Sequence, residues 1–310
     1  MTIRKIEKHD TGAVIKLWNE AMPTHRTDGH LFLKNVFLDM NYDPDGFLLA
    51  FSEDELVGFV WAVIRRYPID VNAPSEEGHG YINLFTLKSE ADASTVGREM
   101  LFAAERYIRS RGKREIRVSD YSPNYVYPGI NTERRAVSML FSDMEYEQRK
   151  RNISIEIDLL SYEIDERTRS LEELRKSEGF YVGAIEIGEV PELLNYAPPG
   201  WVHRYRRLIS ESGDLGRVRI LKKDGEIIGC AVFGDPYSYP ERFGPFSVRE
   251  DYRGLGLGRL LLSDTLSEMK RRGLKFARAE STPVSGAAYE LYRKLGFKKI
   301  NEYILYSKKM

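Results

Sequence analysis

A glycine-rich stretch from Phe243 to Leu262 constrains the fold of this chain more than any other segment. Apolar residues at 246–248 predict a short strand, and apolar spacing from residue 256 onward predicts an amphipathic helix. Glycines 254, 256 and 258 lie between the two, where the backbone can bend sharply and approach a ligand closely. The first N–H groups of a helix have no partner within the helix, so the segment predicts a phosphate-binding turn.

The glycine spacing excludes two common phosphate-binding loops. No Lys-Ser or Lys-Thr pair follows, as a P-loop requires, and Arg259 stands where a dinucleotide-binding loop has its third glycine. The spacing does match Arg-x-x-Gly-x-Gly, formed by Arg253, Gly256 and Gly258. A glycine-rich turn also occurs where a strand packs tightly against a helix. Other motifs in the chain are therefore needed to distinguish phosphate binding from packing.

Composition restricts the class of protein. Hydrophobic residues make up 42% of the 310 residues and aromatic residues 12%, which suits one large domain or two ordinary ones. Lys and Arg number 47, as do Asp and Glu, so bulk charge favours neither nucleic acid nor a membrane surface. The N-terminus has no apolar segment, and no window approaches the roughly 20 apolar residues of a membrane span. We therefore expect a soluble, cytoplasmic protein.

Cysteine and histidine usage argues against metal chemistry. Cys230 is the only cysteine and lies in an apolar stretch, so we expect a buried thiol and not a nucleophile. His25, His30 and His79 lack the spacing of metal ligands, so we expect no metal site.

The pattern of predicted strands and helices occurs twice, with an offset of roughly 150 to 160 residues. A charge-rich segment between the two copies predicts a helix with a mostly solvated surface. We therefore predict an α/β fold of two similar domains, each a twisted mixed β-sheet flanked by helices. The domains are residues 1–160 and 180–310, joined by a connector helix within 161–179.

A second motif follows the glycine turn: Ala288-Tyr-Glu-Leu-Tyr-Arg-Lys-Leu-Gly-Phe297. Its Tyr292 stands 34 residues after Gly258, with a predicted strand between them. In this order and spacing, the two motifs resemble the signatures of the GNAT-type N-acetyltransferases, which bind acetyl-coenzyme A. The resemblance is strong over residues 180–310, and the repeat extends it to a tandem-domain form.

The resemblance implies a coenzyme site around the glycine turn. Pantetheine would lie along the strand ending at Val248, which a bulge would separate from the strand at 276–279. The pyrophosphate would lie over the turn, and Ser285 stands where the family commonly has asparagine. The implied coenzyme-binding residues are Phe246, Ser247, Val248, Arg253, Gly254, Leu255, Gly256, Leu257, Gly258, Arg259, Ser285 and Tyr292.

The resemblance also implies direct transfer of acetyl to a primary amine within a ternary complex. Tyr292 would protonate the leaving thiolate as the general acid, although a packing aromatic would also fit its place on the helix. Glu280, which follows a predicted strand near the expected cleft, is a tentative general base. Glu241, Asp235 and His203 are further candidates, and each would equally fit a solvated or capping role.

The first half has lost the features that carry the resemblance. When Gly97 is aligned with Gly258, Asp92 replaces Arg253 and Thr95 replaces Gly256, so charge and a Cβ oppose a pyrophosphate. Phe141 stands in place of Tyr292. We expect a degenerate copy that does not bind acetyl-coenzyme A in the ordinary manner. Its aromatic insert at 121–130 would either wall the acceptor pocket or be an ordinary packed loop.

The leading hypothesis is an acetyltransferase whose second domain acetylates a small-molecule or peptide amine. Two alternatives remain open at this point. The donor could be a longer acyl-coenzyme A, or the protein could be a coenzyme-binding sensor or scaffold without turnover. No sequence feature selects the acceptor or indicates an oligomeric state.

Overall fold

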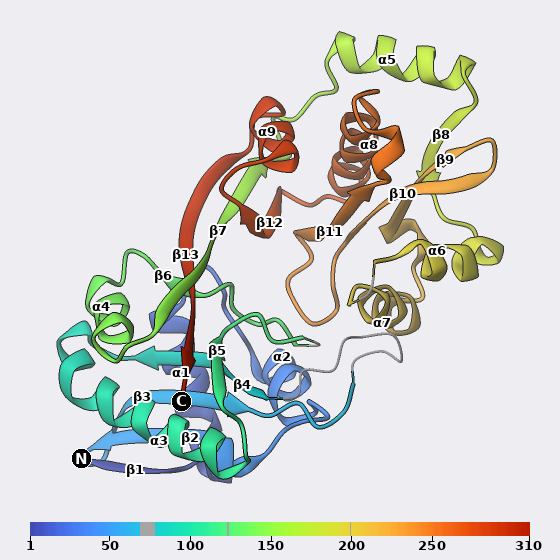
Figure 1. Ribbon diagram of the computed structural model, residues 1–310. Coiled ribbons are helices and arrows are strands. Elements are labelled where there is room, and N and C mark those ends of the chain that lie inside the picture. The colour runs from blue at the N-terminus through green and yellow to red at the C-terminus, as the bar shows by residue number, and fades with distance from the viewer. Residues whose placement is uncertain (69–77, 123, 199) are drawn as a thin grey trace. The chain divides into compact units, whose positions relative to one another are not determined.

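The structure, a computed structural model, describes residues 1–68, 78–122, 124–198 and 200–310 (Figure 1). The first half of the chain contains β1 (Thr2–Lys5), α1 (Thr11–Ala21), α2 (Gly29–Phe32), β2 (Phe47–Ser52), β3 (Glu55–Val63), β4 (His79–Leu87), α3 (Arg98–Ser110), β5 (Glu115–Val118), β6 (Ile130–Asn131), α4 (Arg135–Asp143) and β7 (Glu147–Asp158). The second half contains α5 (Glu166–Ser177), β8 (Phe180–Ala184), α6 (Val190–Tyr196), α7 (Val202–Ser212), β9 (Val218–Lys223), β10 (Glu226–Phe233), β11 (Arg242–Val248), α8 (Leu257–Arg271), β12 (Phe276–Pro283), α9 (Ala287–Lys294) and β13 (Lys298–Lys309).

The described residues form two compact units, Met1–Asn152 with Asn301–Met310, and Ile153–Ile300. Each unit includes the C-terminal part of the last strand of the other half of the chain. In the first unit β13 pairs antiparallel with β5, and in the second unit β7 lies beside β12. The expected boundaries at 1–160 and 180–310 follow the order of the motifs along the chain and do not include this exchange of strands.

The sheet of the second unit has the order β7-β12-β11-β10-β9-β8. Its strands from β8 to β11 pair antiparallel, whereas β11 and β12 pair parallel, so the sheet is mixed as expected. Alternate residues of a strand face opposite sides of the sheet. Ile220 accordingly packs in the core with α6 and α7, and Leu221 packs with the apolar face of α8.

The first unit has the strand order β1-β2-β3-β4-β5-β13, with β4 and β5 parallel. Trp18 and Trp61 belong to an aromatic-rich core on one side of its sheet, and Met100 packs in a second core beneath α3. The insert at 121–130, of which residue 123 lies outside the described residues, packs into this unit. Tyr121 is fully buried, and its hydroxyl donates a hydrogen bond to Asp39 at 2.8 Å.

Candidate functional site

The strands β11 and β12 part soon after β11 begins. Arg242 and Phe243 pair with Arg278 and Ala279, and the remaining pairs of β11 run along β10 alone as far as Val248. Between two of these pairs β11 contains one residue more than β10, which is a β-bulge. The expected bulge and separation of the strands are therefore present. Most of β11 has an open edge along which an extended ligand can form main-chain hydrogen bonds.

The glycine turn follows β11 and opens α8. Gly254 and Gly256 have φ angles of 87° and 78°, which residues with a Cβ rarely adopt. Within the described residues, the N–H groups of Leu257 and Gly258 have no acceptor. A Cβ added to Gly258 would come no closer than 3.4 Å to Leu291, so packing does not require glycine there. The missing Cβ leaves space beside unpaired N–H groups at the positive end of the helix.

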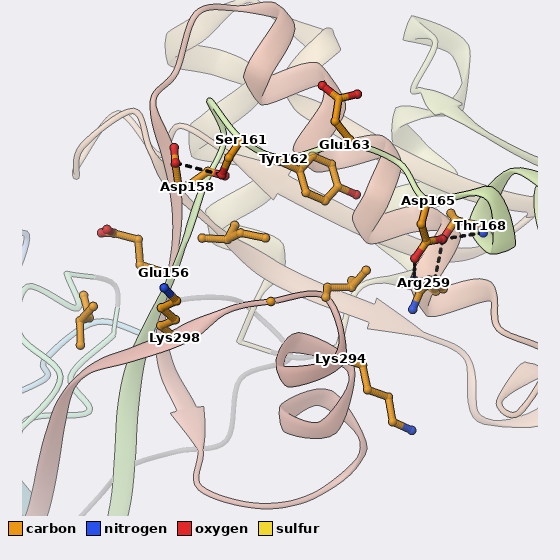
Figure 2. Close-up of a pocket in the computed structure, with 14 residues that line it drawn as sticks. Glu156, Asp158, Ser161, Tyr162, Glu163, Asp165, Thr168, Arg259, Lys294 and Lys298 are labelled. Carbon is orange, nitrogen blue, oxygen red and sulfur yellow. Dashed lines mark hydrogen bonds and ion pairs between the residues drawn. The ribbon is translucent and has the colours of Figure 1, made fainter.

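The two arginines of the turn have different surroundings. Arg253 is 62% exposed and lies 2.5 Å from the carboxylate of Glu250, which is 82% exposed. Arg259 is only 16% exposed and is held by two groups at the start of α5 (Figure 2). Its guanidinium donates to Thr168 Oγ1 at 2.5 Å and forms an ion pair with Asp165. Both arginines therefore have a carboxylate partner, but the pair of Arg253 is exposed to solvent and weak, so Arg253 can exchange Glu250 for a phosphate more easily than Arg259 can leave Asp165 and Thr168.

The connector helix α5 contacts the glycine turn directly. Arg175 donates a hydrogen bond from Nε to the backbone oxygen of Leu255 at 3.0 Å. A Cβ on Gly256 would lie 2.7 Å from a methyl carbon of Leu171, so α5 leaves no room for a side chain there. The sequence predicted this helix but not its role in holding the turn.

Tyr292 lies at the aromatic centre of the second unit. Its side chain is 7% exposed, and its ring is within 6.2 Å of the rings of Phe243, Phe246 and Phe297. Among the described residues its hydroxyl has no hydrogen-bond partner. Burial raises the pKa of Tyr292 above its ordinary value, so the phenol keeps its proton. This environment fits both packing and proton donation.

The two serines expected to bind the coenzyme differ in burial and in hydrogen bonding. Ser247 shares a hydrogen bond of 3.0 Å with the hydroxyl of Tyr196 on α6, so it faces the side of the sheet opposite α8. Ser285 is exposed just before α9. Close to Ser247, Cys230 is fully buried, and burial raises its pKa to about 11, which agrees with a thiol that is not a nucleophile.

Glu280 directly follows Ala279, the last residue of β12 that pairs with β11. Its two carboxylate oxygens accept hydrogen bonds from the hydroxyls of Tyr239 and Ser154. Tyr239 belongs to the loop before β11, whereas Ser154 lies on β7 and comes from the first half of the chain. No motif in the sequence points to Ser154, because only the strand exchange brings β7 beside β12.

The other candidate general bases are Asp235, Glu241 and His203, and their surroundings differ. Asp235 lies between Arg204 and Arg207, with oxygen–nitrogen distances of 3.0 to 3.3 Å. Burial alone would raise its pKa, but these arginines hold it well below its usual range, so Asp235 is a poor proton acceptor. Glu241 and His203 are half-buried, and the backbone oxygen of Glu241 accepts from β12.

A pocket of about 580 Å³ lies beside the beginnings of α5 and α8 (Figure 2). Its lining combines acidic and basic side chains around Tyr162, and of the expected site residues it includes Arg259. The lining residues are Glu156, Ile157, Asp158, Ser161, Tyr162, Glu163, Asp165, Thr168, Arg259, Lys294, Leu295, Gly296, Lys298 and Ile300. The pocket therefore adjoins the glycine turn but does not contain Glu280 or Tyr292.

Neither a metal-binding cluster nor a membrane-spanning helix is present in the described ranges. There, no three His, Cys, Asp or Glu side chains are grouped so that they could hold a metal ion. No helix in the same ranges has the length and apolar character needed to cross a membrane.

Two family models match the chain, one in each half. The "Acetyltransferase (GNAT) family" model matches residues 12–125, and the "Acetyltransferase (GNAT) domain" model matches residues 214–299. The first half is thus recognised although its glycine turn has lost the motif.

Curated relatives match a smaller part. A mycothiol acetyltransferase of Acidothermus cellulolyticus is 31% identical over 110 residues, which are 33% of this chain and 34% of the relative. One of Amycolatopsis mediterranei is 29% identical over 110 residues, which are 34% and 36% of the two chains. The chain therefore matches about a third of the length of these relatives.

Solved structures share the fold over almost the whole chain. A GCN5-related glucosamine N-acetyltransferase region of a fungal multi-domain GH3 β-N-acetylglucosaminidase has a TM-score of 0.78 at 18% identity, covering 99% of this chain and 38% of that one. A GCN5-related N-acetyltransferase from Sphaerobacter thermophilus has a TM-score of 0.72 at 16% identity, covering 99% and 95%. A tandem GNAT protein of clavulanic acid biosynthesis has a TM-score of 0.64 at 11% identity, covering 99% and 98%. With a GNAT model matching each half and this tandem fold throughout, the chain belongs to the GNAT acetyltransferase family and contains two GNAT domains.

Proposed function

We propose that this protein transfers the acetyl group of acetyl-coenzyme A to a primary amine, in a ternary complex, within its second GNAT domain. The observation that carries the proposal is the open edge of β11 next to the unpaired N–H groups of Leu257 and Gly258. An extended pantetheine arm can pair with the open edge of β11, and a pyrophosphate can accept hydrogen bonds from the unpaired N–H groups. In the first domain, Asp92 and Thr95 stand at the corresponding positions of the turn.

The coenzyme would lie along β11 with its phosphates at the start of α8. The N–H groups of the turn and the exposed Arg253 would bind the pyrophosphate, and Gly258 leaves space for its close approach. The space between β11 and β12 would then direct the thioester toward Tyr292 and Glu280.

The acceptor must lose a proton before it reacts, since only a neutral amine can attack the thioester carbonyl. Glu280 would accept that proton, directly or through a water molecule. Its hydrogen bonds from Tyr239 and Ser154 would fix the carboxylate at the point where the strands part. The amine nitrogen then forms a bond to the carbonyl carbon, and the carbonyl π electrons move to its oxygen. A backbone N–H near Val248 would stabilise that oxyanion.

Collapse of this intermediate restores the carbonyl and breaks the carbon–sulfur bond. The sulfur leaves with the bonding electrons as a thiolate and takes the phenolic proton of Tyr292. Burial keeps Tyr292 protonated until that moment, because it raises the pKa of the phenol. The nitrogen, which still carries both of its protons after the attack, loses one of them to solvent as the amide forms. The products are an N-acetylated amine and free coenzyme A, and exchange with solvent returns a proton to Tyr292 and removes the proton from Glu280.

The comparisons support this reaction class and leave the acceptor open. The curated relatives are named mycothiol acetyltransferases, and a structure with the same fold is named a glucosamine N-acetyltransferase region. Because the chain matches only about a third of the length of those curated relatives, their names do not assign its acceptor.

Calorimetric titration of acetyl-coenzyme A, followed by a thiol-release assay with amines, tests the proposal. The panel contains glucosamine, polyamines, amino acids and peptides with free N-termini. We expect about one coenzyme site per chain and thiol release only when an acceptor is present. Binding without turnover on any amine would favour the sensor alternative, and absence of binding would overturn the proposal.

Two glycine variants provide a matched control for the titration. Gly256→Glu forces a side chain into a left-handed φ of 78° and against Leu171, so coenzyme binding should fall below detection. Gly188→Glu adds the same charge where a Cβ would meet nothing within 4 Å, and binding should be unchanged. Equal affinities for the two variants would exclude the glycine turn as the phosphate site.

A further inference from the structure

An arginine cluster lies at the beginning of the loop between β10 and β11. Arg204 and Arg207, one turn apart on α7, both approach Asp235. Arg207 lies 3.1 and 3.0 Å from the two carboxylate oxygens, and its guanidinium stacks 3.8 Å from the ring centre of Tyr237. The backbone N–H of Tyr237 donates to the same carboxylate at 3.0 Å. Asp235 is therefore well paired by Arg207 and its own loop.

Arg204 is not well paired. Its guanidinium carries five N–H donors, and within the described ranges its sole hydrogen bond is one of 3.3 Å to Asp235. Its side chain is nevertheless only 21% exposed. Within the part of the chain that the structure describes, no nitrogen of Arg204 is both sealed from solvent and without a partner, so the unmatched donors of this mostly buried guanidinium can be reached by a ligand. An anionic oxygen group bound here would satisfy it.

The charges around Arg204 also favour binding of an anion. Arg242, at the start of β11, is 8% exposed, so three arginines surround the one carboxylate of Asp235. Burial lowers the pKa of Arg204 to about 10, and the charges of Arg242 and Arg207 contribute. This lowering agrees with a positive charge that Asp235 compensates only in part.

The cluster is within reach of the proposed reaction centre. Asp235 and Tyr239 are four residues apart, a span of at most about 14 Å even in a fully extended chain. Tyr239 hydrogen-bonds Glu280, and Arg242 is the first residue of β11 paired with β12. A small molecule could thus place an amine at Glu280 and an anionic group at Arg204.

We propose that Arg204, with Arg242 and Arg207 around it, binds a carboxylate or phosphate group of the acceptor, so that the substrate is an amine that also carries an anion. This inference rests on the proposed acetyltransferase function and specifies its substrate class. Amino acids, short peptides with a C-terminal carboxylate and phosphorylated amino sugars belong to this class.

Matched acceptor pairs at saturating acetyl-coenzyme A test the inference. The first pair is 4-aminobutyrate and 4-aminobutanamide, and the second is glucosamine 6-phosphate and glucosamine. At least one anionic member should have a KM lower than its neutral partner by about tenfold or more, and the pair that responds identifies carboxylate or phosphate. Equal KM values within both pairs would overturn the inference and leave the acetyltransferase proposal standing.

Arg204→Gln should abolish that preference without changing the KM of acetyl-coenzyme A or of the neutral acceptor. Arg204→Lys retains the charge but not the planar fork, so it should recover part of the preference. Arg206→Gln, on an exposed neighbour in the same helix, should behave as the wild type. If Arg204→Gln raised the KM of both members of a pair equally, the residue would have a structural role and the inference would fail.

A binding measurement separates this inference from the proposed function. Glutarate is titrated into the protein with coenzyme A present, so that the glycine turn is already occupied. Saturable binding that Arg204→Gln removes and Arg206→Gln retains would support the anion site even if no amine in the panel were acetylated. Binding that persists in Arg204→Gln would overturn it.

Discussion

Gly97 of the first domain and Gly258 of the second occupy equivalent positions in the repeat, yet their surroundings differ. A Cβ on Gly97 would lie 2.7 Å from a methyl carbon of Leu140, whereas a Cβ on Gly258 would lie 3.4 Å from Leu291, the equivalent leucine. In the first domain the helix α4 is packed tightly onto the turn. In the second, the corresponding contact is loose enough to admit another group.

The C-terminal ends of α3 and α8, the helices that follow the two turns, make the same kind of contact in both domains. Arg111 and Arg272 are equivalent residues just after α3 and α8, and each is bound by a carboxylate, Asp43 or Asp214. Each of these aspartates lies four residues before a strand and caps a short 3-10 turn. The repeat is thus preserved where the helix is fastened to the sheet and changed where a coenzyme would bind.

The two domains also differ in how their pair of parallel strands ends. In the second domain β11 and β12 diverge, whereas in the first β5 ends at Val118, followed by positive φ angles at Ser119 and Asp120. The insert then packs beside β4, and the side chain of Asn83 donates to the backbone oxygen of Asn124 at 3.1 Å. The insert therefore occupies space beside β4, the strand that corresponds to β11 in the repeat.

The surface next to the first turn is acidic. A pocket of about 970 Å³ there is lined by Glu53, Asp54, Glu55 and Asp92, while Lys88 is paired with Glu55. Carboxylates repel a pyrophosphate, so this surface argues against coenzyme binding. The comparison leads to the proposal that the first domain is a structural partner and that each chain has one coenzyme site.

The largest expected effect concerns Tyr292. If it is the general acid, Tyr292→Phe should lower kcat by roughly 10²- to 10⁴-fold and leave the affinity for acetyl-coenzyme A within about twofold. Stopped-flow thiol release and calorimetry measure the two quantities. The control is Tyr289→Phe on the same helix, which should retain full activity.

The reciprocal change tests the comparison between the domains. Phe141→Tyr restores the hydroxyl in the first domain, where Phe141 is fully buried. It should not add a second coenzyme site, because the strands and turn remain filled. A titration with two sites per chain would contradict the proposal of a single site.

The next effect separates packing from ligand binding. Gly97→Ala should lower the free energy of unfolding by about 1–3 kcal/mol, because its Cβ meets Leu140 and Leu87 too closely. Gly258→Ala should leave stability unchanged or raise it by up to about 1 kcal/mol, since alanine favours helix. It should nevertheless weaken acetyl-coenzyme A binding by roughly tenfold, or about 1.4 kcal/mol. Urea denaturation and calorimetry would distinguish the two outcomes, and the reverse pattern would invalidate the comparison.

Local patterns account for what the sequence predicted. The spacing of Gly256 and Gly258 predicted the turn, and apolar periodicity predicted α8, which the structure begins at Leu257. In the first half, α3 begins at Arg98, after a π-helical turn at Ala93–Gly97. These features depend on neighbouring residues, so a single sequence contains enough information for them.

Contacts between distant segments could not be predicted in this way. Ser154 and Glu280 are 126 residues apart, and Asp165 and Arg259 are 94 apart. A repeat in sequence does not reveal which copy supplies the last strand of each sheet, and a charged connector helix does not reveal what it covers. The under-paired Arg204 is likewise visible only once its neighbours are located.

Acid should weaken the contact that both domains retain. Hydrogen bonds from Arg272, against the effect of burial, lower the pKa of Asp214 from 3.8 to about 2, and Arg217 contributes. A depressed carboxylate pKa stabilises the folded state above the ordinary pKa, and that contribution is lost as pH falls from about 4 to 2. The difference in Tm between wild type and Asp214→Asn should therefore shrink over this range. A constant difference would mean that the ion pair does not contribute.

Asp43→Asn provides the corresponding measurement in the first domain. Asp43 is 9% exposed and Asp214 is 34% exposed, and Asp43 also accepts a hydrogen bond from Tyr107. Loss of a buried carboxylate with several donors costs about 1–3 kcal/mol, so Asp43→Asn should lower Tm more than Asp214→Asn. Equal shifts would show that burial does not distinguish the two contacts.

The smallest effect concerns the contact of α5 with the glycine turn of the second domain. Asp165→Asn removes the charge that neutralises Arg259 but preserves the helix cap, because asparagine caps as well as aspartate. Arg259 would then attract the pyrophosphate more strongly. Asp165 is 53% exposed, so the gain in coenzyme affinity should stay within the range of surface ion pairs, up to about fivefold.

Asp158→Asn is the matched control, since Asp158 lines the same pocket but bonds Ser161 and not Arg259 (Figure 2). Both variants remove one negative charge from the second domain, so a general electrostatic effect would raise affinity equally in both. A gain confined to Asp165→Asn, and diminished by salt, would mean that α5 sets how strongly the turn binds phosphate. A loss of affinity would mean instead that the Asp165–Arg259 ion pair holds the turn in its binding conformation.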